Sequence, residues 1–223
     1  MQFDLSRAKD GIVLVDKPAG WTSFDVVAKI RGQIRGEYMA RGEKPTKRQL
    51  KVGHAGTLDP FATGLLIILL GDATKKADEF LKLDKVYEAT IRLGQTSTTG
   101  DPEGEISDVS GAQPSKEAAE SALSKFVGTI KQSPPAFSAI KINGQRAYKL
   151  ARAGKEVVVP EREVTIYSLE LLDYLYPEVR IRANVSSGTY IRTLAEDIGS
   201  ILQTGAYCHS LRRISIDHYQ ISL

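Results

Sequence analysis

One fifteen-residue stretch, Lys51–Leu65, constrains this chain more than any other part of its sequence. It contains three glycines and one proline, which favour a sharply folded backbone, and it runs directly into the apolar segment Leu65–Leu70. A short continuous apolar run of this kind is typical of a strand at the centre of a sheet. The chain is therefore expected to fold around a tight loop attached to a central strand.

Asp59 is the only acidic residue of that loop. Pro60 disfavours helical backbone at Asp59 and pushes it toward an extended conformation. A carboxylate held on a stiff loop beside an apolar strand is a candidate nucleophile. A structural Asp-Pro turn is the alternative interpretation, because this dipeptide is a common turn former.

Composition limits the class of protein. The chain has 223 residues, of which 42% are hydrophobic and 26% charged, which is typical of one globular unit or of a domain with an appendage. No apolar run approaches the ~20 residues needed to cross a bilayer, and the first residues lack the apolar core of a signal peptide, so we expect a cytoplasmic protein without a membrane partner. The single cysteine, Cys208, is expected to be a buried thiol, and three histidines with one cysteine show no metal-ligand spacing. We therefore expect no metal.

The charge is mild overall but unevenly distributed. The net charge is +3, while two basic segments flank the aspartate loop. The first holds Arg31, Arg35, Arg41, Lys44, Lys47, Arg48 and Lys51 against Glu37 and Glu43; the second holds Lys141, Arg146, Lys149, Arg152 and Lys155 with no acid. Such segments are either solvated surfaces or contacts for nucleic-acid phosphates, and charge alone leaves both open.

Periodicity predicts a mixture of strands and helices. We expect strands at 11–15, 65–70, 85–94, 164–172, 178–185 and 211–217, and helices at 74–83, 115–126, 145–153 and 193–203. A further helix is expected to begin at Thr22 or Ser23, to bury Phe24, Val27, Ile30 and Ile34, and to end at Gly36. The hairpin-like returns predict an α+β fold in one domain over 1–223, with a mixed, largely antiparallel sheet flanked by helices and loops.

The string from Gly56 to Gly64, Gly-Thr-Leu-Asp-Pro-Phe-Ala-Thr-Gly, closely resembles the catalytic motif of the TruB family of tRNA pseudouridine synthases. Further segments resemble that family: Asp16-Lys17-Pro18-Ala19-Gly20, Lys85-Val86-Tyr87, Ser187–Leu194 and Leu211-Arg212-Arg213. The stretch Pro134–Gly154 is similar to the family's thumb loop. The resemblance therefore implies the pseudouridine synthase fold, with a thumb inserted at about 133–156.

The resemblance implies three catalytic residues, namely Asp59 as the nucleophile, Tyr87 as an aromatic ring that stacks on uracil and moves protons, and Arg192 as the partner of Asp59. We expect Tyr190 and Arg192 to project from the same side of extended backbone, so the following helix should start at or after Arg192. A core tyrosine and a surface arginine are the plainer alternatives for Tyr87 and Arg192.

The resemblance also implies substrate-binding residues, which are His54, Tyr190, Leu211, Lys17, Pro18 and Arg213. In the family, the histidine contacts the flipped-out bases and the leucine lines the uracil pocket. The lysine and proline support the active-site loop, and an arginine such as Arg213 suits phosphate. Leu211 as a plain core residue is the alternative.

The function implied is isomerisation of uridine to pseudouridine in the T loop of tRNA, at position 55, without a cofactor. The T stem-loop would be the partner, and we expect a monomer with no obligate protein partner. Family members usually continue into a small C-terminal PUA-like RNA-binding domain, whereas this chain ends at Leu223. We therefore expect no such domain here, and expect the basic segment from Arg31 to Lys51 to contribute more to RNA binding.

Three other functions stay open at this point. The chain could be a tRNA-binding and tRNA-folding protein with secondary catalysis, or a guide-dependent synthase that modifies ribosomal RNA. The stretch that resembles the thumb favours a stand-alone enzyme over the guided type. A carboxylate-based hydrolase is a more distant alternative, because no second acid stands at a recognisable spacing from Asp59.

Overall fold

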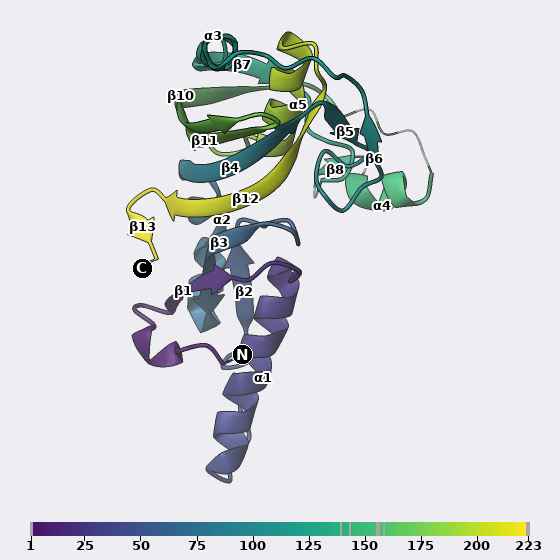
Figure 1. Cartoon of the computed structure of the whole chain (residues 1–223). Coiled ribbons are helices and arrows are strands. Elements are labelled where there is room, and N and C mark those ends of the chain that lie inside the picture. Colours follow the sequence, from purple (N-terminus) through teal and green to yellow (C-terminus); the bar gives the residue numbers. More distant parts are fainter. Residues whose placement is uncertain (1, 139, 143, 155–156, 158, 222–223) are drawn as a thin grey trace. The chain divides into compact units, whose positions relative to one another are not determined.

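Two units make up the fold (Figure 1). The computed structural model describes residues 2–138, 140–142, 144–154, 157 and 159–221. The first unit consists of Met1–Val86 and Arg212–Leu223, and the second of Tyr87–Leu211. Two strands, β4 (Lys85–Leu93) and β12 (Ala206–Ile216), contain the points at which the chain passes from one unit to the other.

The first unit is built around β3 (Thr63–Leu70), whose inner six residues are buried. This strand pairs antiparallel with β1 (Ile12–Lys17) and β2 (Val52–Ala55), and parallel with the C-terminal part of β12, which also pairs with β13 (Tyr219–Gln220). One face of β3 joins a cluster with α1, and the other joins a cluster with Phe80 and Ile216. A strand buried on both faces needs a continuous apolar run, and the predicted central strand is confirmed.

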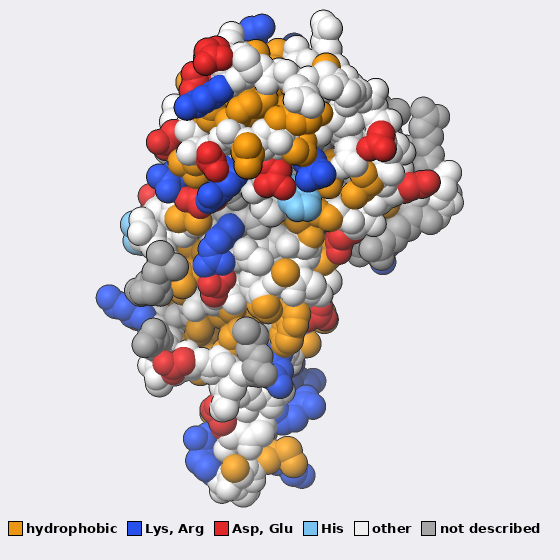
Figure 2. Space-filling view, in the orientation of Figure 1, with side chains coloured by type: hydrophobic (Ala, Val, Ile, Leu, Met, Phe, Trp, Pro, Cys, Tyr) orange, Lys and Arg blue, Asp and Glu red, His pale blue; other side chains and the backbone are white. Residues whose placement is uncertain are grey.

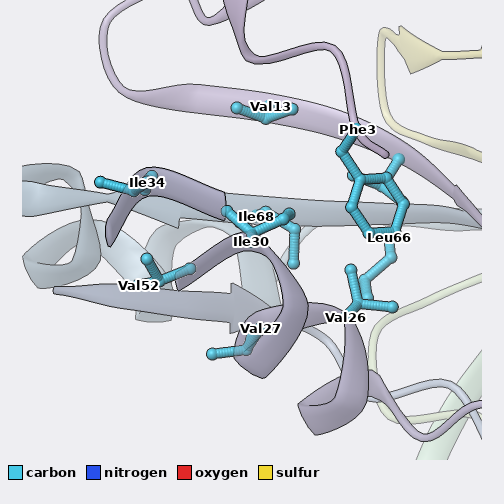
Figure 3. Packing of buried hydrophobic residues seen from close by; sticks show 10 residues of the cluster. Phe3, Val13, Val26, Val27, Ile30, Ile34, Val52, Leu66 and Ile68 are labelled. Atoms are coloured by element: carbon cyan, nitrogen blue, oxygen red, sulfur yellow. The ribbon is translucent and has the colours of Figure 1, made fainter. Parts of the chain in front are cut away.

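Helix α1 (Ser23–Ala40) covers one face of this sheet. Its N-terminus is closed by a capping box, in which Thr22 accepts from the Asp25 amide and Asp25 accepts from the Thr22 amide. Figure 3 shows the apolar stripe of α1, including Val26, Val27 and Ile30, packed against the strands.

Two details of the predicted helix α1 are wrong. Phe24, expected to be buried, is 61% exposed, and Val26 is buried instead. The helix continues past Gly36 to Ala40, because a glycine inside a helix costs only about 1 kcal/mol and open space surrounds this one. The turn after the helix instead uses Gly42, whose φ is +75° and whose N–H donates to Met39 O at 2.9 Å.

The remaining elements of the first unit are short. A 3₁₀ turn, η1 (Leu5–Arg7), precedes β1. The helix expected at 74–83 is a 3₁₀ segment, η2 (Gly71–Lys76), followed by a single turn, α2 (Ala77–Leu81).

The second unit is a mostly antiparallel sheet in the order β12, β4, β11 (Glu178–Val185), β10 (Arg162–Leu175) and β7 (Gly128–Gln132). Helices α3 (Lys116–Ser124) and α5 (Ile191–Ile201) belong to it, and α3 contacts both β10 and α5. The strand predicted at 85–94 is confirmed, and along it Ala89, Ile91 and Leu93 are buried while the residues between them are less so. The bounds predicted for β11 are also confirmed.

Outside the thumb-like segment, three described strands of the second unit escaped prediction. These are β7 and the hairpin of β5 (Gln95–Ser97) with β6 (Ile106–Asp108), which lies between the strand expected at 85–94 and the helix expected at 115–126. The three residues of β6 are all exposed, so no apolar alternation marks them in the sequence.

The thumb-like segment contains a short pair of strands besides the helix expected at 145–153. Strands β8 (Lys141–Ile142) and β9 (Gln145–Arg146), of two residues each, pair antiparallel. Helix α4 (Ala147–Arg152) follows them. Asn143 of the expected turn and Lys155 of the basic segment lie outside the described residues. Within the described ranges, no helix combines the length and the apolar character needed to cross a membrane.

Candidate active site

The candidate nucleophile lies on the connection between β2 and β3, here called the catalytic loop (residues 56–62). Asp59 is partly buried there, and its carbonyl oxygen accepts from the N–H of Ala62 at 3.1 Å, which closes a tight turn. The loop ends at Gly64, whose φ is +100° and whose added Cβ would lie 2.3 Å from the Arg213 carbonyl oxygen. Only glycine fits this junction, which explains its place in the motif.

Lys17 supports the catalytic loop by hydrogen bonds to backbone carbonyls. Its side chain is fully buried, and its ammonium group donates to three backbone carbonyls, those of Pro18 at 2.8 Å, Trp21 at 2.6 Å and Pro60 at 3.2 Å. Pro60 O also accepts from the N–H of Gly20 at 2.8 Å. A buried ammonium that satisfies three carbonyls fixes the residue next to Asp59. This contact agrees with the role that the family resemblance implies for Lys17, which is support of the active-site loop.

Ser23 is a second support, and sequence reasoning missed it. The Ser23 hydroxyl is buried, accepts from the N–H of Leu58 at 2.9 Å and lies 3.2 Å from Leu58 O, to which it donates. Thr22 already caps the helix, so the adjacent hydroxyl is available for this contact with the loop. The Thr-Ser pair before Asp25 is the only sequence signal that could have indicated it.

Replacing Ser23 with Ala should loosen the catalytic loop. The change leaves the buried N–H and C=O of Leu58 without the Ser23 hydroxyl, so we expect the free energy of unfolding to fall by about 1–3 kcal/mol. We also expect a several-fold loss in kcat, measured as pseudouridine formation on tRNA. Ser121→Ala, at an exposed serine of α3, is the matched control. Equal stability and kcat in both variants would contradict this role.

Arg213 is a third support. It is 2% exposed, and its guanidinium donates to the carbonyls of Leu65 at 2.7 Å, Gly56 at 3.0 Å and Thr57 at 3.5 Å. Three of the five N–H donors of this guanidinium are thus used inside the unit, and the expected contact of Arg213 with substrate phosphate stays a prediction. The neighbouring Arg212 forms a bidentate pair with Asp16, at 2.9 and 2.7 Å.

A buried lysine lies near Arg213. The Lys85 ammonium donates to the carbonyls of Leu81, at 2.8 Å, and Leu83. Burial, reinforced by the positive charge of Arg213, lowers the pKa of Lys85 to about 8. The folded protein thus releases this proton about two pH units earlier than an unfolded chain, in which a lysine pKa is about 10.4.

The Lys85 shift predicts a pH-dependent stability. Below about pH 8 Lys85 is charged in both states, and the folded state bears the cost of burying the ammonium group. Between about pH 8 and 10 only the unfolded state keeps the proton, so the Lys85 contribution to the free energy of unfolding rises with pH. The free energies of unfolding of the parent and of a Lys85→Met variant should therefore be measured with denaturant at pH 7.5 and at pH 9.5. Relative to the variant, the parent should be more stable at pH 9.5 than at pH 7.5. If the two proteins differed by the same free energy of unfolding at both pH values, the lowered pKa of Lys85 would be contradicted.

His54 and Pro18 complete the predicted residues of the first unit. His54 is half-buried on β2, opposite Ile68 of β3, and five residues before Asp59. Pro18 is partly buried, directly after β1, and its carbonyl accepts from Lys17. Both residues therefore belong to the segments that meet at the catalytic loop.

In the second unit, Arg192 is held in a polar network. It is 3% exposed, in the first turn of α5, which rules out the surface alternative. Its Nη1 lies 3.0 Å from Asp101 Oδ2 and donates to Thr99 O at 2.9 Å, while Nη2 donates to Phe137 O at 2.8 Å. Sequence reasoning missed Asp101, which is also buried. The pairing of Arg192 with Asp59 stays a prediction.

Tyr190 is the N-cap residue of α5, so the helix starts one residue earlier than expected. Its backbone N–H and C=O are both bound by the buried side chain of Gln132, at 2.8 and 3.0 Å. The guanidinium of Arg162 lies over its ring, 4.9 Å from the centroid. The extended backbone assumed for Tyr190 and Arg192 thus ends at Tyr190, and the two side chains bind different partners.

Tyr87 and Leu211 are the remaining predicted residues of this unit. Tyr87 is only partly buried, which disfavours the alternative of a plain core tyrosine, whereas Leu211 is 8% exposed. Nearby on α5, burial raises the pKa of Glu196, and the charge of Arg192 opposes this shift. Among the described side chains, no three His, Cys, Asp or Glu residues are grouped so as to hold a metal ion.

Comparison with known proteins decides the family. Residues 44–191 match the sequence profile of the "TruB family pseudouridylate synthase (N terminal domain)". The chain belongs to the TruB family. A protein of Thermobifida fusca named tRNA pseudouridine synthase B is 45% identical over 95% of this chain and 71% of its own length. The protein of the same name from Parabacteroides distasonis is also 45% identical, over 95% of this chain and 88% of its own length.

Solved structures agree with this family. The chain resembles a protein in a Cbf5-Nop10-Gar1 complex, with 28% identity and a TM-score of 0.70 over 95% of this chain and half of that one. It also resembles a protein in an H/ACA RNP bound to a substrate RNA containing 2′-deoxyuridine, with 26% identity and a TM-score of 0.67 over 95% of this chain and 49% of that one. The predicted α+β pseudouridine synthase fold of this TruB-family chain is confirmed.

Proposed function

We propose that this chain isomerises uridine to pseudouridine in the T loop of tRNA, at position 55, with Asp59 as the nucleophile. The observation that carries the proposal is the catalytic loop, in which buried groups from three elements fix the backbone on both sides of Asp59. Rigid support of this kind is what a nucleophile needs to meet a substrate in a defined geometry. Relatives named tRNA pseudouridine synthase B support tRNA as the substrate.

The reaction conserves every heavy atom. The bond between ribose C1′ and uracil N1 breaks, the base turns, and a new bond forms between C1′ and C5. The C5 proton leaves, and N1 gains a proton. Asp59 is proposed to form a covalent intermediate or to stabilise the charge that develops as the first bond breaks.

The other proposed roles follow the family resemblance. Tyr87 stacks on the uracil and passes the proton from C5. Arg192 keeps the nucleophilic carboxylate ionised and oriented. His54, Tyr190 and Leu211 bind the extruded base and its neighbours, since a base must leave its stack before its glycosidic bond can be reached. Pro18 and Lys17 support the catalytic loop, with the Lys17 ammonium donating to the carbonyls of both Pro18 and Pro60.

Mapping the product on an unmodified tRNA transcript tests the substrate and the position. The purified chain alone, without guide RNA or partner proteins, is incubated with the transcript. Pseudouridines are then labelled with a carbodiimide and located by primer-extension stops. The proposal predicts one stop at position 55, and no stop in a transcript with cytidine at that position. A stop elsewhere would contradict the assigned position.

The same assay separates the alternative functions. A guide-dependent synthase would modify RNA only after guide and partner proteins are added, and a pure tRNA-binding protein would give no stop. The proposal retains the expected cytoplasmic monomer acting as a single catalytic domain over 1–223. Light scattering at micromolar concentration should then give about the mass of one chain, 24.4 kDa.

A further inference from the structure

The first of the two basic segments carries much of the positive charge of the chain. Residues 26–51 carry eight Lys or Arg and two Glu, a net charge of +6, whereas the whole chain carries only +3. All other residues together therefore have a net charge of −3. This segment and the basic segment at 141–155 are therefore the parts of the chain that would attract a nucleic-acid partner by electrostatics.

The structure displays this charge on the outer part of α1 and the loop that follows it. Six exposed cations, here called the α1 basic surface, are Lys29, Arg35, Arg41, Lys44, Lys47 and Lys51. Figure 2 shows Lys and Arg side chains gathered around the outer end of α1. Arg48 is less available, because it pairs with Asp72. The first part of the basic segment, up to Ala40, is thus helical.

Local hydrogen bonds order the loop from 41 to 51. Arg31 binds its far end, with Nε and Nη2 each 3.2 Å from the carbonyls of Leu50 and Val52. Thr46 and Gln49 cap each other, since the Gln49 side chain accepts from the Thr46 N–H at 2.8 Å and Thr46 Oγ1 accepts from the Gln49 N–H at 3.3 Å. A pre-ordered loop loses less entropy on binding than a flexible one.

Apart from Lys29, the α1 basic surface lies away from the catalytic loop within the same unit. Ser23, at the start of α1, binds the catalytic loop, and the helix then runs for 18 residues, about 27 Å at ~1.5 Å per residue. The basic loop and the catalytic loop also lie at opposite ends of β3. Val52, which follows the basic loop, pairs with Leu70 at the end of β3, whereas the catalytic loop directly precedes Thr63 at its start. The eight residues of β3 span about 25 Å at ~3.3 Å each.

We propose that the α1 basic surface binds backbone phosphates of tRNA outside the T stem-loop. This inference rests on the proposed function, which places the target uridine at the catalytic loop. Exposed cations suit phosphates, and only Arg41 among these six has a described acidic partner, Glu43 at 3.8 Å. The part of this surface that follows α1 lies about 25 Å from the catalytic loop, so it would meet a separate part of the RNA. The contact would add affinity without reading sequence.

A charge-neutralised variant tests the proposal. Arg35, Lys44 and Lys47 are all replaced with Gln, and the control variant carries Gln at Lys76, Lys82 and Lys125, three exposed lysines outside the segment. Affinity for full-length tRNA and for an isolated T stem-loop is measured between 50 and 300 mM KCl. We expect the first variant to bind full-length tRNA about tenfold more weakly, with a salt slope lower by roughly 2–3. Its affinity for the stem-loop and its kcat should equal those of the parent.

Three outcomes would overturn the proposal. These are an unchanged salt slope in the first variant, an equal loss in the control variant, and an equal loss on the isolated stem-loop. Failure of the proposed function itself looks different, because the parent chain would then form no pseudouridine in either RNA.

Discussion

Asp59→Asn should abolish pseudouridine formation while leaving tRNA binding almost unchanged. Asparagine keeps the size of the side chain but is not a nucleophile, so we expect a rate loss on the order of 10⁴-fold or more under single-turnover conditions. The loop should stay folded, since its supports are the Lys17 ammonium, the Ser23 hydroxyl and the Arg213 guanidinium, which bind backbone atoms. Affinity for tRNA is therefore expected within about threefold of the parent, because phosphate contacts dominate such binding.

Asp78→Asn is the matched control for this experiment. Asp78 is an exposed aspartate on α2, in the same unit as Asp59, and its replacement makes the same change of charge. The control should retain full activity and the melting temperature of the parent. An active Asp59→Asn variant would disprove the assigned nucleophile, whereas a variant that is inactive only because it is unfolded would show a lowered melting temperature.

Asp101→Asn should produce the largest loss of stability. Arg192 and Asp101 form an ion pair at 3.0 Å with both side chains 4% exposed, and Asp101 also accepts from Thr99 Oγ1 at 2.6 Å and the Glu103 N–H at 3.0 Å. Asn would remove the charge that balances a buried guanidinium. We expect the free energy of unfolding to fall by about 3–5 kcal/mol, measured by urea denaturation.

An exposed ion pair in the same unit provides the comparison. Arg182 and Glu88 lie 2.7 Å apart, but their side chains are 48% and 29% exposed. Glu88→Gln should cost at most about 1 kcal/mol, because solvent screens such pairs. If Asp101→Asn cost no more than Glu88→Gln, burial would not be what makes the Arg192 network important. Combining Asp101→Asn with Arg192→Met should recover part of the loss, since the unpaired charge is then removed.

The sequence predicts those parts of the fold that depend on local pattern. β3 is recognisable because both of its faces are buried, so Leu65 to Leu69 form an unbroken apolar run. β11 is recognisable because Val179, Ile181 and Ala183 alternate with exposed residues. The end of α1 is harder to place, since Gly36 resembles a stop signal but is tolerated inside the helix.

The supports of the candidate site depend on contacts that no local pattern encodes. Ser23 and Leu58 are separated by 35 residues, and Arg192 and Asp101 by 91. Asp101 lies in a polar stretch where nothing distinguishes it from its neighbours before folding. Motif resemblance identifies Asp59, whereas only the fold reveals that Lys17 and Arg213 donate to backbone carbonyls inside the protein.

Tritium release from tRNA transcript labelled with [5-³H]uridine is the most direct test of the central claim, because the proposed isomerisation detaches the hydrogen on C5 of the target base. The purified chain, without guide RNA or added protein, should release one equivalent of tritium per tRNA and then stop. A transcript with cytidine at position 55 should release none. Absence of release from a correctly folded transcript that the chain binds would contradict the account.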